Sequence, residues 1–388
     1  MKIFVLLSRF PYPLEKGDKL RAFHQIKELS KQHEIILCAL SDEPVSKKNL
    51  DILGQYCSEI KVVRLYKFQI FFNLFWKLFF SKSSLQVSYF YNKVAHNVIN
   101  KFIDKTKPDH IYCQLIRVTE YVRKCTIPKT LDYMDALSRG MERRIEESSF
   151  YLKPFLKIET ERLKRYEHFV FNDFNNLTII SKQDKELIVN IKNDSIVVVP
   201  NGVDYSIYQH RISEKKYDLI FTGNMSYPPN VTSAIYIVKE LLPIIWKTYP
   251  LVNLAIVGAN PDSRVIALKS EKVTVTGWVE DISEYYASSK IFVAPMQIGT
   301  GLQNKLLEAM AMKLPCITSN LANNALGAEH NNNILIGNSP EEYAKHVLNL
   351  LENQDIYNSI AENGFNYIKQ HFTWEGTTQI LENLITSK

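Results

Sequence analysis

Short apolar segments alternate with amphipathic segments along most of the chain. The apolar segments are rich in β-branched residues and lack internal polar alternation, which is typical of strands buried on both faces of a parallel sheet. Helices are predicted between them, so the pattern indicates an α/β protein with parallel sheets and right-handed crossovers. We predict strands near residues 2–7, 34–40, 59–65, 109–113, 128–132, 177–181 and 195–199, and again near 217–222, 252–257, 272–276, 291–295, 315–318 and 333–336.

A polar segment that follows Pro200-Asn201-Gly202 divides this pattern into two halves. A chain of 388 residues is long enough for two cores, at roughly 100–200 residues per domain. We therefore predict two doubly wound domains, residues 1–199 and 200–370, and a terminal helix, residues 371–388, that packs back on the first domain. Such sheets bind ligands at the carboxyl ends of their strands, so a cleft between the domains is the expected site.

Glycine and charge are both distributed unevenly between the halves. The chain has 13 glycines, about half the usual ~7%, and ten of them follow residue 200. Residues 1–200 carry ten more basic than acidic side chains, whereas residues 201–388 carry four more acidic than basic ones. A basic half suggests an anionic partner, although scattered solvated lysines give the same count. No nucleic-acid recognition motif is present, so we expect no nucleic-acid partner.

Cysteine usage and the first residues indicate the compartment. The five cysteines are far apart and form no C-x-x-C pair, which speaks against structural zinc and a disulfide framework. The apolar run IFVLL after Met1-Lys2 is too short for a signal peptide, and no run approaches the ~20 apolar residues of a spanning helix. We expect a reducing, cytoplasmic compartment.

The densest chemical signal is IFVAPMQIGTGLQNKLLEAMAMKLPCITS, residues 291–319. It predicts a buried strand, a loop that holds Gly299 and Gly301, and an amphipathic helix that begins near Leu302. The free N–H groups and the dipole of a helix start attract phosphate, and glycines let a ligand approach the backbone. The alternative is a core helix that follows an incidental glycine turn.

Two charged residues lie on this predicted helix. Lys305 is in the first turn, where its ammonium is suited to a diphosphate. Glu308 is one turn further along and is flanked by apolar residues, so its carboxylate needs a partner such as a pair of ligand hydroxyls. In the alternative interpretation this Glu reaches solvent.

This segment resembles the donor-binding motif of glycosyltransferase family 4, the retaining nucleotide-sugar transferases of the GT-B fold. Further segments resemble the family at its order and spacing, over nearly the whole chain. They are SRFPYPLEKGDKLRAFHQIKELSKQHEI near the N-terminus, VVPNGVDYSIY, LIFTGNMSYPPN, LAIVGANP, VTVTGWVEDISEYYASSKIFVAP and FTWEG. The resemblance implies two Rossmann-like domains that face each other across a cleft.

The resemblance also implies residue roles. Glu308 matches the second Glu of the family's E-x7-E motif, which holds the ribose hydroxyls, and Val279 falls in the loop that borders the base. Gly17 with Asp18 matches the N-terminal loop that closes on the diphosphate and the acceptor. The catalytic residues would be Lys305, Glu308 and Asp18, and the further donor-binding positions would be Asn224, Gly299, Thr300, Gly301, Leu302, Gln303 and Asn304.

The chain departs from the family pattern at several positions. Thr300 stands where the first Glu of E-x7-E is expected, and Gly223-Asn224 stands where a basic pair is usual. We therefore place the chain in a subgroup with G-x-G-x-x-N-K-L-L-E, in which Lys305 replaces the missing cations. Candidate acceptor contacts are Asp18, Asp132 and Asp135, of which Asp135 is equally suited to cap a helix.

The expected function follows from the resemblance and from one missing motif. It is retaining, metal-independent transfer of a hexosyl group from a nucleotide sugar, with UDP as the expected nucleotide, to a glycan or lipid-linked acceptor in bacterial polysaccharide or glycolipid synthesis. The chain has no D-x-D motif, so we expect no metal and no cofactor. Two alternatives are a sugar-nucleotide epimerase of the same fold and a donor-binding but catalytically silent partner subunit.

Residues 67–82, KFQIFFNLFWKLFFSK, predict an amphipathic helix with an aromatic face. Its phenylalanines at 68, 71, 72, 75 and 79 fall within about one third of a turn, and Gln69, Asn73 and Lys77 lie opposite. The helix is too short to span a bilayer but fits the interfacial type. The pattern leaves two alternatives open, peripheral contact with the inner face of the cell membrane or packing of the aromatic face on the protein's own sheet.

Overall fold

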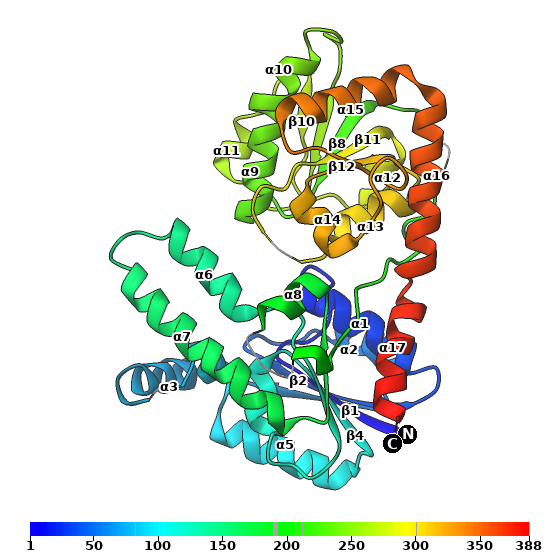
Figure 1. Ribbon diagram of the computed structural model, residues 1–388. Helices are drawn as coiled ribbons and strands as arrows, with labels where there is room; N and C mark the ends of the chain where they lie inside the picture. Colours follow the sequence, from blue (N-terminus) through cyan, green and yellow to red (C-terminus); the bar gives the residue numbers. More distant parts are fainter. Residues whose placement is uncertain (82, 189–192, 212, 300, 388) are drawn as a thin grey trace. The chain divides into compact units, whose positions relative to one another are not determined.

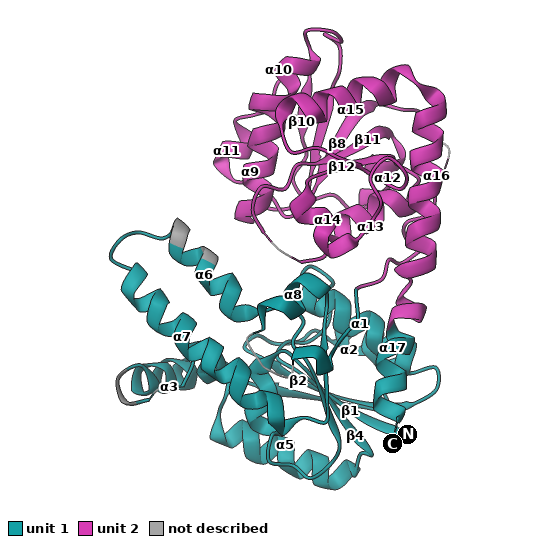
Figure 2. Ribbon diagram, viewed as in Figure 1, with its two compact units in different colours: residues 1–200, 378–388 teal, residues 201–377 magenta. Residues whose placement is uncertain are grey.

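The chain forms two compact units. The computed structural model describes residues 1–81, 83–188, 193–211, 213–299 and 301–387. The first unit consists of residues 1–200 and 378–388, and the second of residues 201–377, as Figure 2 shows. Each unit is built on one parallel sheet, which confirms the predicted α/β class.

The sheet of the first unit has, among the described residues, seven parallel strands in the order β3-β2-β1-β4-β5-β6-β7 (Figure 1). Each strand coincides with a predicted apolar segment to within one or two residues. The strands are β1 Lys2–Leu7, β2 Glu34–Ser41, β3 Glu59–Arg64, β4 His110–Gln114, β5 Lys129–Asp132, β6 Asn176–Ile179 and β7 Ile196–Val198.

Helices cover both faces of this sheet. Alternate residues of β1 explain how: Ile3, Val5 and Leu7 contribute to one core, and Phe4 and Leu6 to the other. The helices are α1 Gly17–Leu29, α2 Lys47–Gly54, α3 Lys67–Phe80, α4 Leu85–Phe90, α5 Lys93–Thr106, α6 Leu137–Glu147, α7 Lys153–Val170 and α8 Lys182–Leu187, with short 3-10 turns η1 Ile116–Tyr121, η2 Phe171–Asp173 and η3 Asn193–Ser195.

The sheet of the second unit has, in the part of the chain that is described, six parallel strands in the order β10-β9-β8-β11-β12-β13. They are β8 Tyr217–Thr222, β9 Leu254–Val257, β10 Val273–Val275, β11 Ser289–Ala294, β12 Cys316–Thr318 and β13 Leu335–Ile336. The surrounding helices are α9 Pro228–Tyr236, η4 Ile237–Leu241, α10 Leu242–Ile245, α11 Ser263–Ile266, α12 Ile282–Ala287, α13 Asn304–Ala311, α14 Asn320–Leu326, α15 Pro340–Glu352 and α16 Gln354–His371.

The last helix, α17 Trp374–Thr386, belongs to both units. It begins in the second unit, and its residues from Thr378 onward are part of the first. There Leu381 and Ile385 are buried in the core that contains Ile3 and Val5. The sheet of the first unit is therefore covered in part by the end of the chain.

A buried ion pair joins α1 to the carboxyl end of β5 in the first unit. Both side chains are fully buried, and Arg21 Nε donates to Asp132 Oδ2 over 2.6 Å. The backbone N–H of Met134 also donates to this carboxylate, over 3.1 Å. Asp132 was expected to contact an acceptor, but its carboxylate is engaged inside the protein, so the structure assigns it a structural role instead.

Helix α3 contacts the protein through polar side chains together with Ile70 and Leu74, which pack in the core of the first unit. Asn73 Nδ2 donates to the carbonyl oxygen of Tyr91 over 2.9 Å, and Gln69 Oε1 accepts from Asn92 over 2.9 Å. Phe71 and Phe72 are 65% and 69% exposed. Packing of the aromatic face on the protein's own sheet is therefore wrong for the described phenylalanines, and the side chain of Phe79 lies outside the described residues.

The buried ion pair generates a stability prediction. Asp132→Asn removes the carboxylate that neutralises the buried Arg21 guanidinium, so we expect the free energy of unfolding to fall by about 3–5 kcal/mol in urea titrations. The control is Glu59→Gln, which removes an exposed pair with Lys105 and should cost at most about 1 kcal/mol. Equal losses in the two variants would contradict the structural role of the buried pair.

Candidate functional site

The turns that follow β8 and β9 approach each other so closely that only glycine fits. Gly223 and Gly258 have φ angles of 150° and 151°, a region that side chains rarely adopt. A Cβ atom on Gly258 would lie 1.7 Å from the carbonyl oxygen of Gly223. The close approach leaves bare backbone at the carboxyl edge of the sheet, where parallel sheets bind their ligands.

The ammonium of Lys305 lies at this glycine turn. It comes from the second residue of α13 and is buried. Its Nζ donates to Asn230 Oδ1 over 2.5 Å and lies 4.7 Å from the centre of the Phe221 ring. A Cβ atom on Gly223 would lie 3.2 Å from Nζ and 2.6 Å from Nδ2 of Asn230. Gly223, Asn230 and Lys305 therefore form one cluster.

This buried cation has no countering carboxylate at ion-pair distance among the residues described by the structure. Burial lowers the pKa of Lys305 to about 7, and the more distant Glu308 offsets part of that shift. An amide oxygen and an aromatic face stabilise an ammonium less than a charged partner does. The arrangement is suited to an anion that brings the missing charge.

Glu308 is held by two tyrosines one turn along α13. The hydroxyl of Tyr286 donates to its Oε2 over 2.9 Å, and Tyr208 also forms a hydrogen bond with this carboxylate. Burial raises the pKa of Glu308, and the bonds from both tyrosines oppose that shift. The residue as a whole is half-buried.

The loop before α13 has the geometry that a ligand-facing turn needs. Gly299 and Gly301 have φ angles of 97° and 90°. The helix begins after Gln303, whose side chain does not cap it, so the first amides of α13 have no side-chain acceptor from that residue. Leu302 is buried, and Thr300 lies outside the described residues.

The remaining predicted positions are more dispersed. Asn304 Oδ1 accepts from the buried Asn201 over 3.0 Å, and Asn224 is exposed and closes its own turn by accepting from Ser226 over 2.8 Å. Val279 is half-buried beside the exposed Trp278.

Gly17 and Asp18 belong to the first unit and begin α1. A Cβ atom on Gly17 would lie 3.3 Å from Met134 Cε, and Asp18 pairs with Arg9 over 2.8 Å. The structure therefore groups the predicted residues of α13 and its loop in one unit and these two in the other.

Three polar residues of this site escaped the sequence analysis. Asn230, Tyr208 and Tyr286 fix Lys305 and Glu308. Each lies in a segment that resembles the family, but the resemblance gave these three residues no role. One signal was available in the sequence: a helix start at Pro228-Pro229-Asn230 shortly after Gly223, at the end of a predicted strand. Among the described residues no group of three or more His, Cys, Asp or Glu side chains is arranged to hold a metal.

Comparison with known proteins agrees with this chemistry. Residues 216–353, inside the second unit, match the family model described as glycosyl transferases group 1. An uncharacterized 44.6 kDa protein in the cps region of Klebsiella pneumoniae is 24% identical, covering 96% of each chain. The Escherichia coli UDP-Gal:alpha-D-GlcNAc-diphosphoundecaprenol alpha-1,3-galactosyltransferase is 25% identical over 53% of this chain and 60% of its own.

Solved structures are similar over the whole chain. Anabaena Alr3699/HepE in complex with UDP has a TM-score of 0.72 at 15% identity, covering 100% of both chains. Sucrose-phosphate synthase from Thermosynechococcus elongatus has a TM-score of 0.70 at 12% identity, covering 99% of this chain and 98% of its own. These likenesses show the GT-B fold, and the family match supports a glycosyltransferase of group 1.

The uncompensated burial of Lys305 predicts a gain in stability when it is removed. Lys305→Met keeps the length of the side chain and removes the cost of burying the charge, so the ligand-free protein should gain about 1–4 kcal/mol in chemical unfolding. Lys269→Met, at an exposed position, should change stability by less than about 0.5 kcal/mol. A marked loss in Lys305→Met would mean that the bond to Asn230 outweighs the burial cost.

Proposed function

We propose that this protein is a retaining glycosyltransferase that takes a hexosyl group from a UDP-linked sugar. The observation that supports this most directly is the buried Lys305 ammonium, which lies at a glycine turn beside a helix N-terminus without a carboxylate partner in the described chain. A diphosphate supplies the negative charge that this position lacks. The match of residues 216–353 to a glycosyltransferase family supports the same assignment.

The donor is assigned to the second unit. Lys305 and the amides of Gly299, Thr300, Gly301, Leu302, Gln303 and Asn304 would hold the diphosphate. Glu308 would accept hydrogen bonds from the ribose hydroxyls. Tyr286 and Tyr208 hold its carboxylate in position, and each carboxylate oxygen has a second lone pair with which to accept. Val279 would border the base and Asn224 the sugar. The acceptor is assigned to the first unit, with Gly17 and Asp18 on the diphosphate side.

The proposed reaction forms and breaks its bonds on one face of the sugar. An acceptor hydroxyl oxygen bonds to the anomeric carbon while the bond from that carbon to the phosphate oxygen breaks. The leaving oxygen keeps the electron pair and takes the hydroxyl proton, so no protein nucleophile is needed. Lys305 and the helix start stabilise the negative charge of the departing diphosphate, which is the role that a divalent ion has in metal-dependent transferases.

The setting that we propose is bacterial polysaccharide or glycolipid synthesis at the cytoplasmic face of the membrane, with a glycan or lipid-linked acceptor. The relatives support this setting through their names, one of which is a protein of a cps region and another a transferase that acts on a diphosphoundecaprenol-linked sugar. No bound cofactor is part of the proposal.

Donor affinity is predicted to depend on pH through Lys305. Its pKa of about 7 means that it is charged below pH 7 and neutral above, whereas the phosphates of UDP are almost fully ionised from pH 7 upward. Binding above pH 7 must therefore take up a proton, and UDP affinity should fall between pH 7 and 9, approaching about tenfold per pH unit. Calorimetric titration of UDP at several pH values measures this slope.

Lys305→Met should bind UDP weakly, and its UDP affinity should not fall between pH 7 and 9. Lys269→Met should bind UDP as the wild-type protein does. A slope that persists in Lys305→Met would assign the titration to another group. Tight, pH-independent binding of UDP to Lys305→Met would overturn the donor site.

Transfer itself is tested with a panel of UDP sugars and extracted lipid-linked or glycan acceptors. Lys305→Ala should fold and lose roughly 10²–10³-fold in kcat, the usual cost of removing one donor to a developing anion. EDTA should leave the rate unchanged, and loss of activity in EDTA would contradict the metal-independent route. Conversion of the UDP sugar without any acceptor would favour an epimerase instead.

A further inference from the structure

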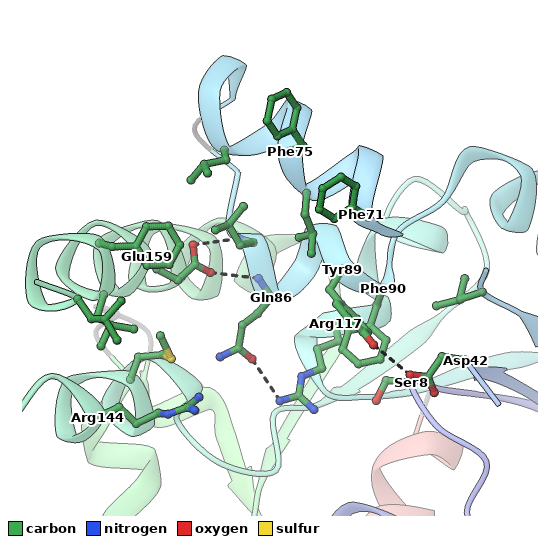
Figure 3. A pocket seen from close by; sticks show the side chains of 18 of the residues that line it. Ser8, Asp42, Phe71, Phe75, Gln86, Tyr89, Phe90, Arg117, Arg144 and Glu159 are labelled. Carbon is green, nitrogen blue, oxygen red and sulfur yellow. Dashed lines mark hydrogen bonds between the residues drawn. The ribbon is translucent and has the colours of Figure 1, made fainter. Parts of the chain in front are cut away.

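The first unit contains a groove of about 850 Å³ between α3, α4, α6 and α7. Its volume is within the range of sites that enclose small ligands. Most of its wall is apolar, and Figure 3 shows Phe71 and Phe75 on one side of the space and Arg144, Arg117 and Ser8 on the other. The groove therefore combines an apolar wall with a basic end.

The basic end lies where β1 and β4 finish. Ser8 and Arg9 directly follow β1, and Arg117 is in the 3-10 turn that follows β4. These are carboxyl ends of parallel strands, where such sheets bind ligands. One end of the groove is thus at the edge of the sheet that the proposed acceptor would occupy.

Arg117 has capacity for an anion. Its Nη2 donates to Gln86 over 3.2 Å, its guanidinium lies 5.4 Å from the centre of the Phe90 ring, and its Nε is buried without a hydrogen-bond partner. Burial and the nearby charge of Arg9 lower its pKa, while Asp135 and Asp18 act in the opposite direction. No ion pair joins it to a carboxylate in the described part of the chain.

The two carboxylates that line the groove are already engaged. Asp42 accepts from the Tyr89 hydroxyl over 3.0 Å. Glu159 accepts from the Ser84 hydroxyl and from the backbone N–H of Leu85 at the start of α4, over 2.7 and 3.0 Å. Neither is paired with Arg117. Arg9, the neighbouring cation, is already paired with Asp18 over 2.8 Å, so Arg117 carries the charge that remains for an anionic group at this end.

Apolar side chains continue from the groove onto the surface. The α3 aromatic face, which we define as Phe68, Phe71, Phe72, Phe75 and Trp76, is more than half exposed at every position. The turn between α6 and α7 exposes Phe150 and Tyr151 by 80% and 89%, and Leu152 and Phe155 connect it to the groove wall. Figure 1 shows α6 and α7 as a hairpin.

This exposed surface has the composition of a membrane-interface element. Aromatic residues are favoured at the level of lipid headgroups, and α3 contains Lys67 and Lys77 but no acidic residue. Among the described residues no helix combines the length and apolar character needed to cross a membrane. Contact would therefore be through a helix lying in the interface.

We propose that the groove holds the hydrocarbon chain of a membrane-borne lipid phosphate acceptor, with the phosphate at Arg117. The α3 aromatic face and the α6–α7 turn enter the lipid interface, so that the chain passes from the bilayer into the groove without crossing water. This inference deepens the proposed function, on which it rests, by selecting a lipid-linked acceptor over a free glycan.

Binding of an anionic amphiphile tests the groove without any sugar transfer. Farnesyl diphosphate should bind at least about tenfold more tightly than either farnesol or inorganic diphosphate, because only the amphiphile uses both the apolar wall and Arg117. Arg117→Gln should lose about tenfold or more of that affinity, the typical size of a charge-assisted hydrogen bond. Arg264→Gln, in the second unit at an exposed position, is the matched control.

A second variant covers the case in which Arg117→Gln does not fold. Phe155→Ser changes a partly exposed groove residue and should weaken farnesyl diphosphate while leaving inorganic diphosphate unchanged. Equal affinities for the amphiphile and for inorganic diphosphate, or full affinity in both variants, would overturn the proposal.

Vesicle binding tests the membrane contact. The protein should sediment with vesicles that contain phosphatidylglycerol and less with pure phosphatidylcholine vesicles. Phe71→Ser with Phe75→Ser should reduce the bound fraction about fivefold or more, because the interfacial burial of two aromatic rings is lost. Leu251→Ser, at a position 87% exposed in the second unit, should have no effect. Unchanged binding of the double variant would refute the contact.

Measuring UDP in parallel separates the two proposals. All groove variants should bind UDP as the unchanged protein does. If UDP binds but farnesyl diphosphate does not, the lipid groove is wrong and the donor site stands. If the amphiphile binds but no nucleotide does, the groove stands and the proposed donor site is wrong.

Discussion

The second unit is organised around an ammonium ion that has been taken out of water without a charged partner in the described chain. Burying Lys305 costs free energy, and the neighbouring residues reduce this cost only in part, through one amide oxygen and one aromatic face. Gly223, at the end of β8, leaves room beside this ammonium, and Gly258, at the end of β9, leaves room for the carbonyl oxygen of Gly223. The unit therefore keeps an unbalanced charge at the place where its sheet presents bare backbone.

The first unit shows the contrasting solution to the same problem. Arg21 is even more deeply buried than Lys305, yet Asp132 neutralises it across α1 and β5. A neutralised ion pair joins the helix to the strand and has no net charge to offer a ligand. A buried cation without a carboxylate partner can still bind an anionic ligand. Arg117 resembles Lys305 in this respect, since amide and aromatic contacts surround it as well. Whether a buried cation has a carboxylate partner thus distinguishes structural charge from available charge in this fold.

Sequence alone predicted the strands and the α/β class, because continuous apolar runs separated by capped helices have few other interpretations. Helices α8 and α12 begin at sequence signals of this kind, since the side chains of Ser181 and Asp281 each accept a backbone hydrogen bond. The features that the sequence did not predict are side-chain contacts between segments that are distant in the chain. Nothing near Asp132 in the chain indicates that Arg21 will neutralise it, and Tyr286 reaches Glu308 only because α12 and α13 are brought together. The orientation of α3 was left open for the same reason.

The route of the chain also sets an order in time. Leu381 and Ile385 complete the core in which Ile3 and Val5 lie, although almost the whole chain separates them. During synthesis, the whole second unit is made before the part of α17 that packs on the first sheet. One face of that sheet is therefore incompletely covered while the second unit is synthesised. The first unit can therefore reach its final packing only after Leu381 and Ile385 have left the ribosome. Until then, the part of its apolar core that α17 covers is exposed to solvent.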